Sequence, residues 1–257
     1  MNQHDFPLRT RIGDWNSICK AHRNELGQTW IDTEEVISIQ SVGIQMLSDE
    51  ASVGVGLNEV QRMAMAFAST HALSTAIGTY SLLLRGHADT AHYLRRALYD
   101  LRAVGPAIAQ DAEFAQTVLT DTTRKENLGV TARKIMSDFG GFTDSAEYKR
   151  FQDAAHMSAT NFAFLLRDQG DGSFVDPDTN EVTMFLGAGV RNRPFAHAMW
   201  LETLVDHSLI TFTLSRFLGR SIEEDRYERL LDIARDATDR FGEIAENRRA
   251  ARNGTSS

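Results

Sequence analysis

Apolar residues recur three and four positions apart along most of the chain. Side chains at this spacing share one face of an α-helix, so the pattern predicts a series of amphipathic helices. The predicted helices cover residues 14–26, 33–47, 58–85, 89–104, 112–119, 127–139, 145–166, 194–218 and 221–249. We therefore expect an all-α protein built as a helical bundle.

Residues at the ends of the predicted helices support these boundaries. Asn58 is a good N-cap for the longest apolar helix, and Ser221 stands three residues before Glu224 in a capping-box spacing. Gly86 follows a helix, as C-terminal glycines commonly do. Pro106 is expected to end the helix before it, because proline lacks the backbone N–H that a helix interior requires.

The helical period is lost between residues 170 and 189. Two short β-prone runs, SFVD and EVTMF, flank Pro177–Asn180, which has the composition of a turn. The pattern predicts a small β-hairpin insertion near residues 172–186.

The chain has 257 residues, which suits one large domain or two small ones. Its apolar share of 42% and charged share of 24% are ordinary for a globular protein and exclude a mostly disordered chain. The sequence has no internal repeat and no long linker. We expect accessory helices in residues 1–50, a helical bundle domain in residues 51–249 and a disordered tail in residues 250–257.

Charge and cysteine content narrow the classes of partner. With 27 basic and 35 acidic residues the net charge is −8, which disfavours nucleic-acid binding through overall charge and leaves room for a local basic pocket. The single cysteine, Cys19, excludes an internal disulfide and any multi-cysteine metal site. The first twenty residues lack the apolar core of a secretory signal, so we expect a cytoplasmic location.

One segment is long and apolar enough to require a membrane test. Met63–Leu84 carries no formal charge over a length that can cross a bilayer. However, hydroxyl groups and the imidazole of His71 are spread along it, and lipid would have to accept them. The segment is therefore predicted to be the central buried helix of the bundle, and no membrane partner is expected.

The sequence lacks the common catalytic and metal-binding signatures. It has no paired Glu-x-x-His motifs of the di-iron bundles, no His-Glu-x-x-His, no phosphate loop and no Gly-x-Ser-x-Gly. We expect neither a metal nor a cofactor.

The segment RNRPFAH, residues 191–197, gathers polar groups at the start of a predicted helix. Pro194 suits a first helical turn, and Asn192 can cap it. The free N–H groups and the positive dipole of this helix end favour a phosphate. In phosphodiester chemistry the Arg191 guanidinium would stabilise charge on the phosphate, and the His197 imidazole would move a proton. Arg191, Asn192 and His197 are therefore the candidate catalytic residues.

This motif, an arginine and a polar residue followed after a short gap by a histidine, resembles the signature of the HEPN superfamily. The resemblance implies a helical-bundle dimer with two motifs facing each other across the interface. It also implies metal-independent RNA cleavage with the ribose 2′-hydroxyl as nucleophile, as in toxin or phage-defence proteins. In such a protein Arg191 would bind the phosphate, Asn192 would orient it and His197 would be the acid or base.

A second stretch, Gly86–Asn161, is similar to an uncharacterised group of bacterial helical proteins. That group has Arg-x-x-x-(Glu/Asp) on one helix and a histidine turn on another, and Arg96, Asp100 and His156 occupy these positions. Arg96 and Asp100 are four residues apart and share a helix face. The three residues are expected to form either a ligand-binding polar pocket or a buried ion pair that fixes helix register.

Three functions stay open from the sequence. The first is a metal-independent ribonuclease, and the second is a non-enzymatic helical interaction protein that forms a homodimer or binds a protein partner. For the second, the last amphipathic helix and the segment Phe174–Phe185 are the candidate surfaces. The third is a small-molecule pocket formed by Arg96, Asp100, His156 and the polar side of Met63–Leu84.

Overall fold

The computed structural model describes residues 19–47, 56–85, 87–120, 127–138, 193–218 and 224–254. Within these ranges every secondary-structure element is a helix, which confirms the predicted all-α class. The hairpin expected near residues 172–186 lies outside the described residues.

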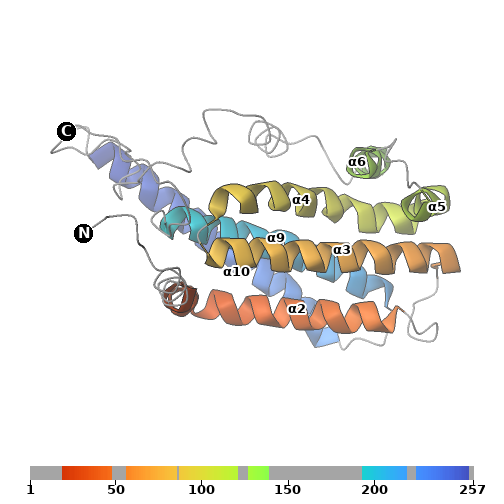
Figure 1. Ribbon diagram of the computed structural model, residues 1–257, viewed down its shortest axis with the longest axis horizontal. Helices are drawn as coiled ribbons and strands as arrows, with labels where there is room; N and C mark the ends of the chain where they lie inside the picture. The colour runs from red at the N-terminus through yellow and green to blue at the C-terminus, as the bar shows by residue number, and fades with distance from the viewer. Residues whose placement is uncertain are drawn as a thin grey trace, which may run out of the picture.

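Seven helices carry the fold (Figure 1). They are α2 (Gln28–Met46), α3 (Glu59–Leu84), α4 (Ala88–Gln110), α5 (Ala112–Thr120), α6 (Leu128–Asp138), α9 (Arg193–Phe217) and α10 (Glu224–Gly254). A further helical segment, residues 19–26, precedes α2 and ends at Gly27, whose positive φ of 51° favours glycine. The long helices lie side by side, and the C-terminal end of α10 projects past the bundle (Figure 1).

Helix α9 is the central element of the bundle. It contacts α2, α3, α4 and α10. Its side chains enter all three apolar clusters of the core, for example through Leu204, Trp200 and Leu214. A helix surrounded on every side needs no polar stripe.

Helix α3 was predicted to hold this central place, and that prediction is wrong. The helix leaves Met63, Phe67 and Ile77 exposed on one face while its opposite side packs against α4 and α9. Sequence alone did not separate the two cases, because α3 and α9 are both apolar over most of their length. None of the described helices combines the length and the apolar character needed to span a bilayer.

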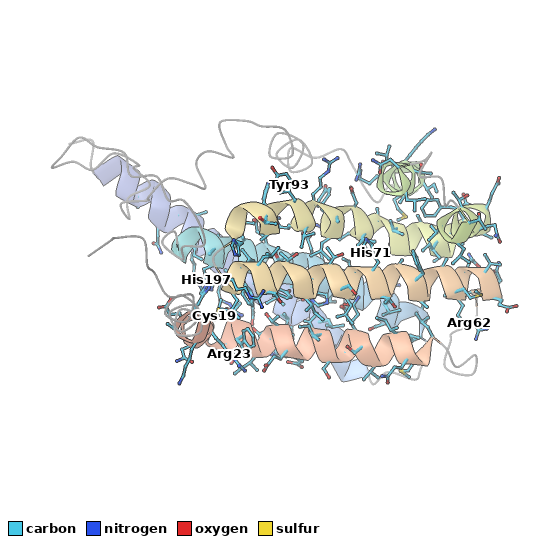
Figure 2. All side chains as sticks on the ribbon, viewed as in Figure 1. Cys19, Arg23, Arg62, His71, Tyr93 and His197 are labelled. Atoms are coloured by element: carbon cyan, nitrogen blue, oxygen red, sulfur yellow. The ribbon has the colours of Figure 1, made fainter. Side chains whose placement is uncertain are left out.

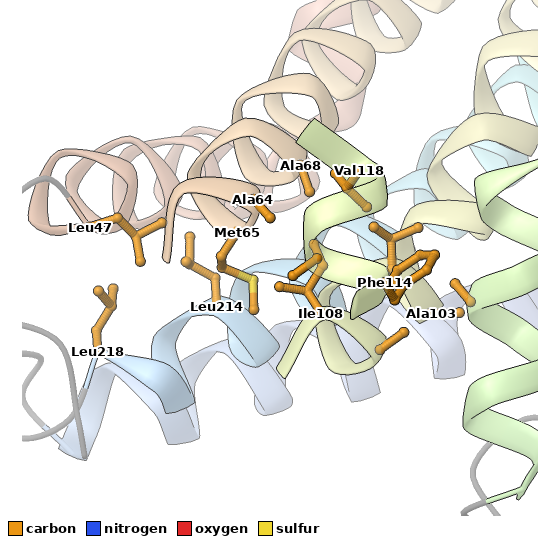
Figure 3. Packing of buried hydrophobic residues seen from close by; sticks show 14 residues of the cluster. Leu47, Ala64, Met65, Ala68, Ala103, Ile108, Phe114, Val118, Leu214 and Leu218 are labelled. Atoms are coloured by element: carbon orange, nitrogen blue, oxygen red, sulfur yellow. The ribbon is translucent and has the colours of Figure 1, made fainter. Parts of the chain in front are cut away.

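The largest apolar cluster of the described residues joins α3, α4, α5, α6 and α9 (Figure 3). Met65, Ile108, Phe114 and Leu214 are among its buried side chains, and burying each stabilises the fold by about 1.5–3 kcal/mol. Gly43 lets α2 approach this cluster closely, because a Cβ there would lie 3.1 Å from the side chain of Leu214.

Helix α4 runs through Pro106 to Gln110, so the prediction that it stops before the proline is wrong. A proline in a helix interior costs about 3 kcal/mol or more. The residues around it, Val104, Ala107 and Ile108, are buried in the core. Their burial compensates for the hydrogen bond that Pro106 cannot donate.

Two helices extend into segments that the sequence assigned to the ends of the chain. Val36 and Ile39 of α2, within the expected accessory region 1–50, share a cluster with α9 and α10. Helix α10 continues to Gly254, into the expected tail of residues 250–257.

Candidate functional site

A charged pocket lies between α4, α9 and α10. It has a volume of about 210 Å³. Its lining residues come from all three helices: Arg95, Arg102, Glu202, Val205, Asp206, Thr238 and Phe241.

Helical spacing explains why four charged groups meet in this pocket. Arg95 and Arg102 are seven residues apart and so lie two turns apart on one face of α4. Glu202 and Asp206 are four apart on the facing side of α9. Arg95 Nη1 lies 2.6 Å from Glu202 Oε2, Arg102 Nη1 lies 2.9 Å from Asp206 Oδ1, and Arg95 Nε lies 3.8 Å from Asp206 Oδ2. We call these four residues the α4–α9 ion-pair network.

The network removes charged groups from water to unequal extents. The side chains of Arg95 and Asp206 are only 5% and 2% exposed, whereas Arg102 and Glu202 are 24% and 21% exposed. Burying a charge is costly unless it is paired and hydrogen-bonded, as these groups are. The network thus presents one partly exposed cation and one partly exposed anion beside the cavity.

The candidate histidine of the RNRPFAH motif lies in the second turn of α9. His197 is half-buried, and its Nε2 is buried without a hydrogen-bond partner among the described residues. Burial lowers the pKa of His197, as do the nearby His22 and Arg240, while Glu25 opposes them. The imidazole is therefore neutral near pH 7 and can accept a proton.

Figure 2 shows His197 at the same end of the bundle as Cys19 and Arg23. Cys19 and Arg23 belong to the helical segment of residues 19–26. Arg191 and Asn192, the other two candidate catalytic residues, lie outside the described residues.

The structure describes two of the three residues in the second candidate group, Arg96 and Asp100. Asp100 of α4 forms an ion pair with Arg133 of α6. Arg96 is half-buried on α4, and His156 lies outside the described residues. Two other arginines of α4, Arg95 and Arg102, line the charged pocket.

A buried polar network crosses the middle of the bundle. The Tyr80 hydroxyl donates to His207 Nδ1 at 3.4 Å, and His207 Nε2 contacts Gln40 Oε1. The Gln40 amide donates to the carbonyl oxygen of Ser69 at 3.1 Å. These partners assign the proton of His207 to Nε2. Burial lowers the pKa of His207 to about 3, so the ring is neutral.

A buried carboxylate joins α2 to α10. Asp32, with only 3% of its side chain exposed, accepts hydrogen bonds from Arg229 Nη2 at 3.0 Å and from Arg240 Nη2 at 2.9 Å. Gln28 Nε2 adds a third bond at 2.9 Å. This arrangement satisfies the buried charge and fixes the α2–α10 contact.

Sequence reasoning missed the charged pocket, although one signal for it was present. Between Pro194 and Ser215, Glu202 and Asp206 are the only residues with a formal charge. Two carboxylates on one face of an otherwise neutral helix indicate a partner of opposite charge. Choosing that partner on α4 required the helix packing, which sequence did not provide.

Comparison with known proteins assigns no function to this site. No family model, curated protein or solved structure matches this chain.

Proposed function

We propose that this chain is a HEPN-like helical protein that cleaves RNA without a metal, with His197 as its proton-transfer group. The observation that carries the proposal is the environment of His197. It lies near the N-terminal end of α9, its Nε2 has no hydrogen-bond partner among the described residues, and burial lowers its pKa. A neutral imidazole with an unengaged nitrogen can act as a general base, and the proposal requires RNA to reach this buried nitrogen.

The reaction follows from the chemistry of a ribose phosphate. His197 takes the proton of the 2′-hydroxyl, and the 2′-oxygen attacks the adjacent phosphorus. The bond to the 5′-oxygen breaks, which leaves a 2′,3′-cyclic phosphate and a 5′-hydroxyl that receives a proton. Arg191 holds the negative charge that builds on the phosphate, and Asn192 orients it.

The resemblance supplies the remaining parts of this proposal. A homodimer would bring two such motifs together, so that one histidine accepts the proton and the other returns it. We further propose a cytoplasmic toxin or defence role, with the β-hairpin near residues 172–186 as an insertion in the bundle.

Incubation of the purified protein with labelled single-stranded RNA in EDTA tests the proposal. We expect cleavage with 2′,3′-cyclic phosphate ends and a loss of rate of at least about 100-fold in His197→Gln, since a positioned proton-transfer group contributes about 10²–10⁴-fold. The matched control is His71→Gln, an exposed histidine of α3, which should leave the rate unchanged. Circular dichroism checks the fold of both variants. RNA left intact by the wild type, or equal rates in the wild type and His197→Gln, would contradict the proposal.

A second candidate function is a homodimeric interaction protein without catalysis. The exposed side chains of Met63, Phe67 and Ile77 fall within about 40° of one direction around α3, at 100° per residue. Exposed apolar patches on a helix commonly mark contact surfaces. The apolar face of the last helix, α10, does not serve this role, because Leu230 and Ile233 pack into the core.

Phe67→Glu tests whether α3 forms the interface of such a homodimer. If α3 is the interface between two copies, this variant is monomeric by light scattering, while Tyr93→Glu, at an exposed aromatic residue of α4, keeps the wild-type mass. A wild-type monomer, or an unchanged mass in Phe67→Glu, would exclude α3 as the interface.

A further inference from the structure

The charged pocket between α4, α9 and α10 offers opposite charges on its wall. We propose that this pocket binds a small zwitterion, an α-amino acid with an apolar side chain. The inference does not depend on the proposed ribonuclease activity.

The charge pattern selects this ligand class. The pocket holds two guanidinium groups and two carboxylates, so its formal charge is balanced. A simple anion near Arg102 would also lie close to Asp206, and a simple cation near Glu202 would lie close to Arg95, because these groups are paired at 2.9 Å and 2.6 Å. A molecule with both charges complements both sides: its carboxylate meets Arg102 and its ammonium meets Glu202.

The remaining wall of the pocket favours an apolar side chain. Val205 and Phe241 are half-buried apolar residues that line the cavity beside the charged groups. The cavity volume of about 210 Å³ is below the range of roughly 300–1,000 Å³ typical of sites for drug-sized ligands. A free amino acid such as leucine or valine suits this size better than a nucleotide or a peptide.

A purely structural ion-pair network has no need of an adjoining cavity. Protein interiors are close-packed, and buried charges gain from contact with their partners rather than from empty space beside them. Here the cavity borders all four charged residues, and two of them are a fifth to a quarter exposed. This combination of buried charge and open volume is typical of a binding site.

Calorimetric titration of the wild-type protein with three matched compounds tests the charge argument without a mutation. Leucine carries both charges, 4-methylpentanoate lacks the ammonium and 3-methylbutylamine lacks the carboxylate. We expect saturable binding of leucine and at least tenfold weaker binding of each analogue. Absence of saturation with leucine, valine and phenylalanine at 10 mM, or equal binding of leucine and its analogues, would overturn the proposal.

Variants then place the binding in this pocket. Thr238→Trp fills the cavity from its exposed rim and leaves the four charged residues in place. Glu202→Gln removes the charge that would hold the ammonium. Both should weaken leucine binding at least tenfold, while Asp232→Asn, in an exposed ion pair of α10, should not change it. Leucine affinity that is unchanged in Thr238→Trp would place the site elsewhere and refute the assignment.

Discussion

His207 is a fully buried histidine whose two ring nitrogens contact Tyr80 and Gln40. A cationic ring at this position would lose its contact with water, and for this reason burial lowers the pKa of His207 to about 3. Burial, with a smaller effect of Asp206, also raises the pKa of Tyr80. Both groups are therefore neutral over the physiological pH range, which suits a hydrogen-bond network that fixes the packing of α2, α3 and α9.

The low pKa of His207 predicts a loss of stability in acid. The unfolded chain binds a proton on this residue near pH 6.5, whereas the folded chain binds it only near pH 3. Between these values the unfolded state holds more protons, so the free energy of unfolding should fall by about 1.4 kcal/mol for each pH unit lost. Urea unfolding at successive pH values measures this slope.

The matched variants for this prediction are His207→Gln and His71→Gln. The first removes the titrating group and should flatten the acid slope, although it lowers stability at pH 7 by about 1–3 kcal/mol because Tyr80 and Gln40 lose a partner. The second changes an exposed histidine and should keep the wild-type slope. An unaltered slope in His207→Gln would mean that other groups cause the acid sensitivity.

Asp32 gives a second prediction about a single residue, because its buried carboxylate forms ion pairs with both Arg229 and Arg240. Asp32→Ala leaves Arg229 and Arg240 without that partner, and both guanidinium groups are partly exposed, so we expect a loss of about 2–3 kcal/mol rather than the larger cost of a fully buried pair. Asp232→Ala, which breaks an exposed pair with Arg235, should cost less than about 1 kcal/mol. Equal losses in chemical unfolding would contradict this ranking.

At the scale of elements, α6 packs on α4 through a close approach at a glycine. The side chain of Asp100 lies so near Gly129 that an added Cβ would sit 2.7 Å from it. The same Asp100 is paired with Arg133 one turn further along α6. The short helix α6 is thus held by the ion pair of Asp100 with Arg133, by the close approach at Gly129 and by the burial of Ala132 in the apolar core.

Two glycine-to-alanine changes test this contact with opposite expected signs. Gly129→Ala should destabilise the protein by about 1–3 kcal/mol, because the new methyl group displaces Asp100. Gly242→Ala lies within α10 with nothing within 4 Å of the new Cβ, and it should stabilise the protein by about 0.5–1 kcal/mol through helix propensity. Thermal unfolding measures both, and stabilisation by Gly129→Ala would show that α6 does not pack in this way.

At the scale of the whole molecule, α10 closes the bundle. Leu230, Ile233 and Ala237 are buried against α2 and α9, whereas the end of the helix projects past the bundle (Figure 1). The contribution of α10 to the core therefore lies in its middle turns.

This division predicts the effect of two truncations. A chain that stops after Glu246 retains the buried residues of α10 and should unfold cooperatively within a few degrees of the wild-type Tm. A chain that stops after Arg229 loses three core side chains and the contact of Arg240 with Asp32, and it should not fold cooperatively. Calorimetry measures the Tm and the cooperativity of unfolding of both chains. Cooperative unfolding of the shorter chain would contradict the role given to α10.

The pattern of apolar residues was sufficient to predict the all-α class and the positions of most helices in the described residues. Helix formation depends on local spacing and on caps such as Asn58, whose side chain accepts from the backbone N–H of Gln61 at 2.9 Å, and both are written in consecutive residues. The roles that the sequence gives to Arg191, Asn192 and His197 remain predictions.

Only the tertiary structure decided which helix is central, that α4 continues through Pro106, and that Arg95 and Arg102 of α4 pair with α9. Each of these depends on energies summed over residues far apart in the chain, since burial on neighbouring helices outweighs local propensity. The charged pocket likewise depends on residues that are distant in the chain, because Arg95 and Glu202 are 107 positions apart. Local spacing determines which face of a helix a side chain occupies. The packing of the helices determines which residues of other helices that face contacts.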